Sequence, residues 1–450
     1  MNSEHNFGTG SIWKNIMSLA IPMTIAQLIN VLYSVVDRIY IGHIPDASTQ
    51  ALTGIGLTLP IITIITAFAN LFGMGGAPLF SIARGAGEDE RAKKIMGTSF
   101  SMLVLTSFVL MAVFFIWKRP LLILFGASSS TLPYADSYLN IYLFGTLFVM
   151  VSLGMNSFIN AQGFGRTGMC TVLIGAVMNI ILDPVFIFVF HMGVEGAAIA
   201  TVISQGVSSV FVFSFLRGKK TLFQLTKSSV KIEISLLKEI SGLGLSGFVM
   251  SVTNGSVQIV CNAVLSRFGG DLYVGIMTVL NSVRELITMP VTGLTNAAQP
   301  VIGFNYGAGE YKRVKSAIRF MSVFCIVFTT LMWAFLFFFP QGFIHLFNSD
   351  PALLKEGVPA MKLYFFGIFM MSLQFSGQST FVALGKSKQA VFFSLFRKVI
   401  IVIPLTLFLP SLFNLGTDGV FLAEPISNFI GGSASFFTMY FTVWRKLPNR

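Results

Sequence analysis

Three polar positions interrupt an otherwise apolar stretch of the sequence, NIILDPVFIF at residues 179–188. Asn179 and Asp183 are four residues apart, so on a helix they lie on one face. Pro184 has no N–H to give the carbonyl of Ile180, which leaves that oxygen free. A carboxylate, an amide oxygen and a free carbonyl are hard oxygen ligands, suited to a proton or Na⁺ rather than to a soft metal. Two interpretations remain open: a coupling-ion pocket, or a carboxylate that pairs with a neighbouring hydroxyl or Arg and fixes helix packing.

Few other acidic residues interrupt the apolar stretches. A charged side chain near the middle of a membrane helix costs about 2.5–3.5 kcal/mol on insertion scales, so it usually marks a pathway or a pairing partner. Asp37, Glu285 and Glu424 fit this description, and Arg284 directly precedes Glu285. Adjacent residues point in different directions on a helix, so Arg284 and Glu285 are each expected to pair with another element. For this pair a structural role is as well supported as a functional one.

The composition explains why these acids stand out. The chain of 450 residues is 54% hydrophobic and only 11% charged, whereas about a quarter of the residues of a soluble domain are charged. The sequence therefore predicts an all-α polytopic membrane protein. Its net charge of +12 does not indicate a nucleic-acid partner, because the basic residues cluster in short loops between apolar stretches. The three cysteines and four histidines show no metal-binding spacing, so no metal or other cofactor is expected.

Twelve membrane spans are expected, because a span needs about 20 largely apolar residues. They are residues 15–41, 52–78, 95–117, 137–160, 169–190, 195–216, 240–266, 274–300, 317–340, 360–383, 390–412 and 418–443.

The basic residues also predict an orientation. With the N-terminus inside the cell, most of the 30 Lys and Arg fall in cytoplasmic segments, as the positive-inside rule requires. This assignment counts Arg397 and Lys398, near the start of the eleventh span, as cytoplasmic. We therefore expect a multi-pass protein of the plasma (inner) membrane with both termini in the cytoplasm.

The two halves of the sequence repeat one another. GAGEDERAK at 85–93 returns as GAGEYKRVK at 307–315, and GVEGAAIATVISQ at 193–205 parallels GTDGVFLAEPISN at 416–428, displaced by one further residue. Each half holds six spans, so the halves have the same orientation and are related by an axis along the membrane normal. The expected organisation is an N-lobe (1–218), a cytoplasmic linker (219–239) and a C-lobe (240–450). Two such bundles suit alternating access, although they also occur in channels and in proteins without a transport role.

The chain resembles the multidrug and toxic compound extrusion (MATE) family, and most closely its bacterial exporters. The resemblance covers essentially the whole chain. It is carried by AIPMTIAQLINVLYSVVDRIYIG, NAQGFGRTGM, NIILDPVFIF, GVEGAAIATVISQ and PVTGLTNAAQPVIGFNYGAGEYKRVK.

This resemblance implies a MATE fold and the export of cationic, amphipathic compounds in exchange for H⁺ or Na⁺. The expected partners are small organic cations and membrane lipid, and the expected state is a monomer. The family's coupling-ion site carries over to four positions of the N-lobe, with two more completing the network. The four are Asp37, Asn179, Asp183 and Thr201, and the two are Tyr138 and Asn156.

The C-lobe departs from some relatives, which carry acids in the seventh and tenth helices. Here the seventh span has Asn254 and Gln258 and the tenth has no acid. The repeat places Ile259, Ile401 and Leu405 opposite Asp37, Asn179 and Asp183, and Glu424 opposite Thr201. Coupling is therefore expected in the N-lobe. The possible polar sites of the C-lobe are Asn254, Gln258, Arg284, Glu285 and Glu424.

Two other functions can be weighed against export. A lipid-linked saccharide flippase of the same superfamily needs Arg or Lys in its cavity for a pyrophosphate, and only Arg38 and Arg284 fall plausibly within the predicted spans. A membrane transferase needs clustered acids that hold Mg²⁺, and no two acids lie close together in any span. The sequence thus favours a transporter that is not an enzyme and has no catalytic residues.

Overall fold

The structure, a computed structural model, describes residues 6–44, 48–345 and 350–448. Within these ranges every regular element is a helix. The chain forms two compact units, of which the first comprises Ile21–Gly244 and the second comprises Phe7–Ala20 with Leu245–Arg450. Each unit has its own hydrophobic core.

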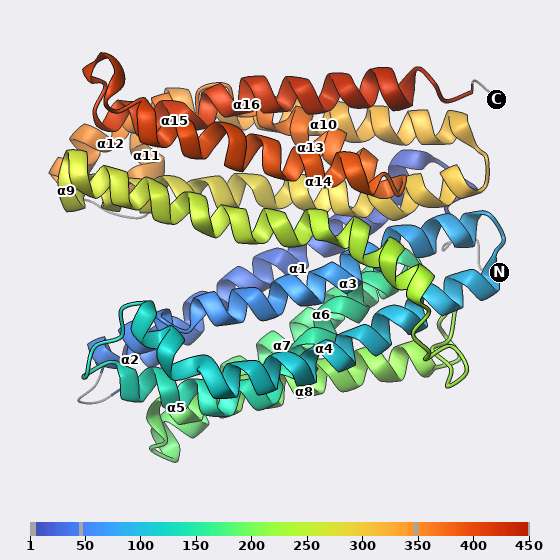
Figure 1. Ribbon diagram of the computed structural model, residues 1–450, viewed down its shortest axis with the longest axis horizontal. Coiled ribbons are helices and arrows are strands. Elements are labelled where there is room, and N and C mark those ends of the chain that lie inside the picture. The colour runs from blue at the N-terminus through green and yellow to red at the C-terminus, as the bar shows by residue number, and fades with distance from the viewer. Residues whose placement is uncertain (1–5, 45–47, 346–349, 449–450) are drawn as a thin grey trace. The chain divides into compact units, whose positions relative to one another are not determined.

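The helices of the first half surround one core. In chain order they are α1 (Ile12–Ile41), α2 (Ser48–Gly56), α3 (Leu59–Gly85), α4 (Asp89–Leu124), α5 (Leu132–Tyr142), α6 (Thr146–Ala161), α7 (Gly165–Pro184) and α8 (Gly193–Arg217), with a π-helical turn, η3 (Val185–Val189), after α7. Helix α3 packs against α4 and α6, and α7 packs against α8 (Figure 1). Gly73 and Gly154 permit the contact between α3 and α6, because a Cβ built on Gly73 would lie 2.6 Å from the Gly154 carbonyl oxygen.

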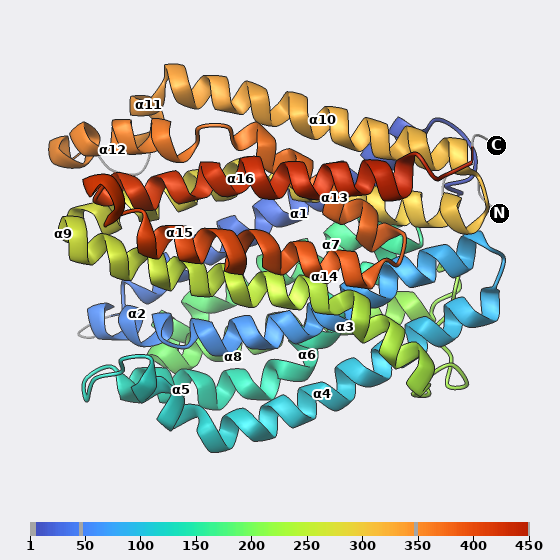
Figure 2. The ribbon, with the colours of Figure 1, turned by 45° about the horizontal axis from the view of Figure 1, so that its top comes forward.

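The second half begins with a long element, α9 (Ile234–Gly307), in which Gly270 has a non-helical backbone with φ of 70°. The later helices are α10 (Tyr311–Phe338), α11 (Pro340–His345), α12 (Pro351–Tyr364), α13 (Ile368–Ala383), α14 (Ser387–Leu395), α15 (Ile403–Phe408) and α16 (Thr417–Met439). A π-helical segment, η4 (Phe396–Val402), joins α14 to α15, and another, η6 (Tyr440–Trp444), follows α16. Helix α13 packs against α10 and α16, which run alongside it (Figure 2).

Each of the twelve predicted spans coincides with helical structure. Nine helices in the described part of the chain are long and apolar enough to cross a membrane, and α12 with α13 adds a tenth that is bent by 46°. Gly270 separates the predicted spans 240–266 and 274–300 within one of the nine, α9. The last predicted span corresponds to α16, which is not among the nine.

The outer surface of these helices is apolar, as a lipid-facing surface must be. On α4, for example, Phe108, Val109 and Ile116 are exposed, whereas Ser99 and Ser107 are buried. A soluble protein would show the reverse pattern. The chain is therefore an integral membrane protein.

Two segments outside the spans are held by specific contacts. In residues 219–239, predicted as a linker, the Thr221 hydroxyl and the Phe223 N–H both donate to Gln162 Oε1, at 2.7 and 2.9 Å. Near the N-terminus, the Phe7 carbonyl accepts from Asn305 and Arg313. The first segment thus packs within the first unit, and the second segment packs within the second unit.

Candidate functional site

The predicted pair on the fifth span lies at the end of α7, where the helix widens. Asn179 Nδ2 donates to Asp183 Oδ1 at 3.2 Å and to Thr201 Oγ1 of α8 at 3.4 Å. Asp183 is fully buried, and Asn179 is 2% exposed. Helix α7 ends at Pro184 and continues as the π-helical turn η3. Such turns arise where the α-helical hydrogen-bond pattern is interrupted, and the missing N–H of proline interrupts it here.

Asp37 of α1 interacts with Asp183 through their charges and, when one of the two carboxyl groups carries a proton, through a side-chain hydrogen bond. Within the described residues, Asp37 Oδ1, Asp183 Oδ2 and Asn179 Oδ1 are buried oxygens without a hydrogen-bond partner. Two neighbouring carboxylates in a site of low polarity do not both stay ionised unless a cation lies between them. Without a cation, one of the two takes up a proton. The arrangement is therefore able to take up a proton, or to offer oxygen ligands to a small cation.

Tyrosine hydroxyls complete this group. Tyr138 of α5 forms a hydrogen bond with Thr201, interacts with Asp37 and stacks on Tyr142 with ring centres 5.8 Å apart. Tyr33 of α1 interacts with both Asp37 and Asp183. The sequence analysis missed Tyr33, although a signal was available: it precedes Asp37 by four residues and so shares its helical face.

Asn156 of α6 lies beside the same group. It lines a cavity of about 50 Å³ together with Asn30, Tyr33, Asn179 and Thr201. Its Nδ2 donates to the Gly168 carbonyl at 3.3 Å. A cavity measured in this way needs about 10–15 Å³ to hold a water molecule, so this cavity can hold water or an ion and is too small for a drug-sized molecule.

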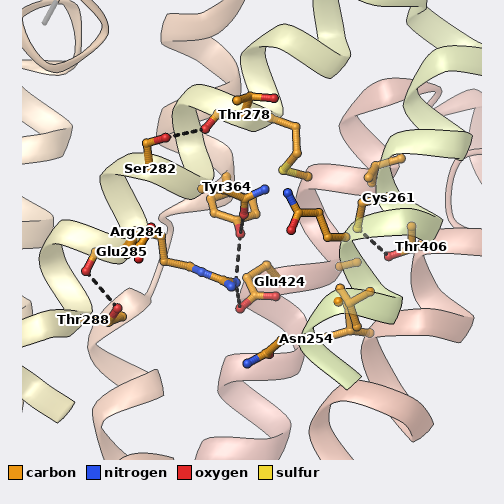
Figure 3. Close-up of a pocket in the computed structure, with 18 residues that line it drawn as sticks. Asn254, Cys261, Thr278, Ser282, Arg284, Glu285, Thr288, Tyr364, Thr406 and Glu424 are labelled. Atoms are coloured by element: carbon orange, nitrogen blue, oxygen red, sulfur yellow. Dashed lines mark hydrogen bonds and ion pairs between the residues drawn. The ribbon is translucent and has the colours of Figure 1, made fainter. Parts of the chain in front are cut away.

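The five polar residues predicted for the C-lobe line a second, larger cavity of about 460 Å³ within the second unit (Figure 3). Arg284 Nη1 donates to Glu424 Oε1 at 3.2 Å and to the Tyr364 hydroxyl at 3.1 Å. Asn254 and Gln258 contribute amides to the lining, and Glu285 is an exposed part of it. Arg284 therefore pairs with a residue of another helix, Glu424 of α16, as the sequence led us to expect.

Two further basic residues, which are not part of this lining, contact Glu424, and they correct the sequence analysis. Arg397 Nη1 donates to Glu424 Oε1 at 2.8 Å and to Asn428 Oδ1 at 2.8 Å. Lys398 Nζ lies 3.6 Å from Glu424 Oε2. Both cations are buried in η4, inside a helix that is apolar enough to span the membrane. Their assignment to a cytoplasmic segment was wrong, because the positive-inside rule concerns loop residues and these two side chains pair with a buried acid.

No group of three or more His, Cys, Asp or Glu side chains in the described part of the chain is arranged to hold a metal ion. The first-unit group contains two carboxylates, Asp37 and Asp183, and its other polar atoms are amides and hydroxyls. It therefore suits a proton or a singly charged cation better than a divalent metal.

Known proteins are similar to this chain in both of its halves. The MatE family model matches residues 22–185 and 248–408, one segment in each half. The multidrug export protein MepA of Staphylococcus haemolyticus is 27% identical over 436 residues, which cover 96% of this chain and 94% of that protein. MepA of Staphylococcus saprophyticus is 28% identical over 439 residues, covering 96% and 95%.

Solved structures are similar over almost the full length. A MATE protein crystallised in the bent conformation has a TM-score of 0.93 at 22% identity, covering 99% of this chain and 98% of that one. An outward-facing multidrug resistance MATE family transporter of the MOP superfamily has a TM-score of 0.91 at 22% identity, covering 99% of each chain. The predicted all-helical membrane fold is thereby confirmed.

Proposed function

The chain belongs to the MatE family, and on that premise we propose that it is a secondary active multidrug efflux transporter. Its substrates would be cationic, amphipathic small molecules, exported by antiport with H⁺ or Na⁺. The names of the relatives support this proposal, since they are multidrug export proteins along nearly the whole chain. They also support a transporter rather than an enzyme.

The observation that carries the proposal is the pair of carboxylates in the first unit. Asp37 Oδ1 and Asp183 Oδ2 are buried and lack hydrogen-bond partners among the described residues. A proton or Na⁺ bound between them would neutralise one of the two negative charges, and its release would restore the charge that attracts an organic cation. Ion and drug would then exclude each other. Because coupling between two ligands is reciprocal, the ion gradient would drive drug release and the drug would drive ion release.

Efflux measurements in proteoliposomes test this proposal. The purified protein is reconstituted with a fluorescent organic cation, and a pH gradient or a Na⁺ gradient is imposed in turn. We expect one gradient to drive transport in the wild type, and Asp37→Asn and Asp183→Asn each to abolish the gradient dependence. Asp271→Asn, at an exposed acid next to the Gly270 break, should transport like the wild type. Full-rate coupled transport by Asp183→Asn would refute the proposed coupling site.

The proposal extends to location and assembly. We propose that the protein acts as a monomer in the plasma membrane with both termini in the cytoplasm, because most basic loop residues then face the cytoplasm. Cysteine labelling with a membrane-impermeant maleimide tests the orientation. A cysteine placed at exposed Lys219 should react in inverted vesicles and not in intact cells.

One observation favours a second candidate, a lipid-linked saccharide flippase. Such a protein needs buried cations for a pyrophosphate, and Arg397 and Lys398 add two that the sequence analysis did not count. We keep the exporter as the better proposal because Arg284, Arg397 and Lys398 all contact Glu424, and because the relatives are named as multidrug exporters. If neither gradient drives any organic cation, the flippase becomes the leading candidate.

A further inference from the structure

The larger cavity is suited in size and lining to an organic ligand. Its volume of about 460 Å³ lies within the range of 300–1,000 Å³ that is typical of small-molecule sites. Its lining is mostly polar and includes Asn254, Gln258 and Asn281, and Val257 and Val402 are among its apolar residues. Arg284 and Glu424 lie in the polar part, where the guanidinium points toward the carboxylate (Figure 3).

Basic side chains are concentrated on one carboxylate beside this cavity. The guanidinium groups of Arg284 and Arg397 both donate to the same oxygen, Glu424 Oε1. A guanidinium is always protonated in a protein, so one carboxylate faces two permanent positive charges. Lys398 adds a third basic group, 3.6 Å from Glu424 Oε2. Glu285 is the other acid of the lining, but it is exposed and therefore weakened by solvent screening.

Some of the basic groups also lack hydrogen-bond acceptors. Arg397 is 7% exposed and Lys398 is 3% exposed, and neither Arg397 Nε nor Lys398 Nζ has a hydrogen-bond partner among the described residues. Arg284, which lines the cavity itself, makes its hydrogen bonds to described residues through Nη1. Its Nη2 and Nε are left to donate to a ligand. A planar guanidinium with two donors available is the group best suited to bind a carboxylate.

This charge is peculiar to the second half of the chain. The repeat aligns Arg397 and Lys398 with Gly175 and Ala176 of α7, which carry no charge. The first unit places two carboxylates in its polar group, whereas the second unit places Arg284, Arg397 and Lys398 around one buried carboxylate beside its cavity. The second half therefore offers basic donors that the first half lacks at these positions.

We propose that the cavity of the second unit binds the carboxylate of an amphiphile, with Arg284 as the residue that contacts it. The ligand's apolar part lies against Val257 and Val402, and the amides of Asn254 and Gln258 donate further hydrogen bonds. The inference concerns binding at this site, and it rests on the proposed function only where the bound compound is also exported.

A matched pair of dyes tests this inference by equilibrium binding, without any ion gradient. Tetramethylrhodamine carries a free carboxylate, and its methyl ester carries the same cation without one. Binding of each dye to the full-length protein is measured by fluorescence polarisation in nanodiscs of phosphatidylcholine. We expect the wild type to prefer the free-carboxylate dye. Arg284→Gln should weaken that dye about tenfold, the scale of one charge-assisted hydrogen bond, and leave the ester unchanged.

Two control variants and a lipid control sharpen the result. Arg284→Lys keeps the charge without the planar donor pair, so it should retain part of the preference. Arg319→Gln, at an exposed arginine of α10, should bind both dyes like the wild type. Unchanged ester binding by Arg284→Gln shows that the variant is folded. Nanodiscs of phosphatidylglycerol provide a competing lipid phosphate, and the preference should persist in them.

The inference is overturned if the wild type binds both dyes equally, or if Arg284→Gln weakens both dyes to the same extent. It is also overturned if phosphatidylglycerol abolishes the preference of the wild type, because the cavity would then take a lipid headgroup. None of these outcomes bears on whether Asp37 and Asp183 couple transport to an ion gradient, so the two proposals fail independently.

Discussion

Asn179 Nδ2 donates to Asp183 Oδ1 at 3.2 Å, one helical turn away on α7. This bond engages one oxygen of the carboxylate and leaves Oδ2 without a hydrogen-bond partner among the described residues. The amide therefore fixes the orientation of the acid while its second oxygen stays available. A helix that needed only packing at these positions could carry aliphatic residues, as the second half does at Ile401 and Leu405.

The first prediction concerns this orientation. Asn179→Leu removes the donor to Asp183 and Thr201, so gradient-driven efflux should fall by about tenfold, the scale of one hydrogen bond to a charged group. The measurement is the initial rate of dye efflux from proteoliposomes. Thr201→Ser, which keeps the hydroxyl, should stay near the wild-type rate. Wild-type efflux by Asn179→Leu would mean that the amide has no part in coupling.

The second prediction concerns the tyrosine that the sequence analysis missed. Tyr33 interacts electrostatically with both Asp37 and Asp183, so Tyr33→Phe, which removes the polar hydroxyl beside the two carboxylates, should lower the efflux rate several-fold. Tyr40→Phe is the matched control, because Tyr40 of the same helix packs on Phe188 with ring centres 6.3 Å apart. Equal rates for the two variants would exclude a role for the Tyr33 hydroxyl.

The third prediction concerns stability. Glu424→Gln removes the carboxylate that Arg284, Arg397 and Lys398 share, and leaves buried cations without a counter-charge. Removal of one partner from a buried ion pair costs about 3–5 kcal/mol, so thermal unfolding in detergent should occur at a clearly lower temperature. Adding Arg397→Gln to Glu424→Gln should recover part of the loss.

The control for that measurement is an exposed acid. Glu88 pairs with Arg91 at the surface, and surface pairs contribute about 0–1 kcal/mol. Glu88→Gln should therefore unfold near the wild-type temperature. If Glu424→Gln unfolds at that same temperature, the ion-pair group does not stabilise the second unit.

The fourth prediction concerns the contact between α3 and α6. A Cβ on Gly73 would lie 2.6 Å from the Gly154 carbonyl oxygen, so Gly73→Ala must push the two helices apart. Overpacking costs about 1–3 kcal/mol, which should be visible as a lower unfolding temperature in detergent. Gly56→Ala is the control, because no atom lies within 4 Å of a Cβ built there. A Gly73→Ala variant as stable as the Gly56→Ala variant would contradict the close contact.

Much of the fold was predictable from the sequence, because a membrane span is a local property of composition. Asn179 and Asp183 were predictable as a pair for a similar reason, since their spacing alone places them on one helical face. The resemblance to the MATE family added Thr201, which lies on another helix and which no local spacing connects to them. The structure brings these three side chains together through two hydrogen bonds from Asn179.

Arg397 and Lys398 could not be placed by the same reasoning. Whether a basic residue near the end of a span reaches water or turns inward depends on the side chains that pack against it, and the partner here, Glu424, lies on a different helix. Glu424 itself offered a signal, because a buried acid in an apolar span needs a cation nearby. Choosing the cation required the arrangement of α9, η4 and α16 in three dimensions.

The π-helical segment that holds Arg397 and Lys398 has a consequence for how the two halves diverged. The offset between matching motifs is 222 residues at 307–315 and 223 residues at 416–428, and η4 lies between these two motifs. A single residue inserted into a helix can be absorbed as a π turn, which redirects the side chains of the turn and leaves the flanking helix in register. One insertion of this kind would be sufficient to turn basic side chains toward Glu424, and it offers a route by which two halves of common origin acquired different interiors.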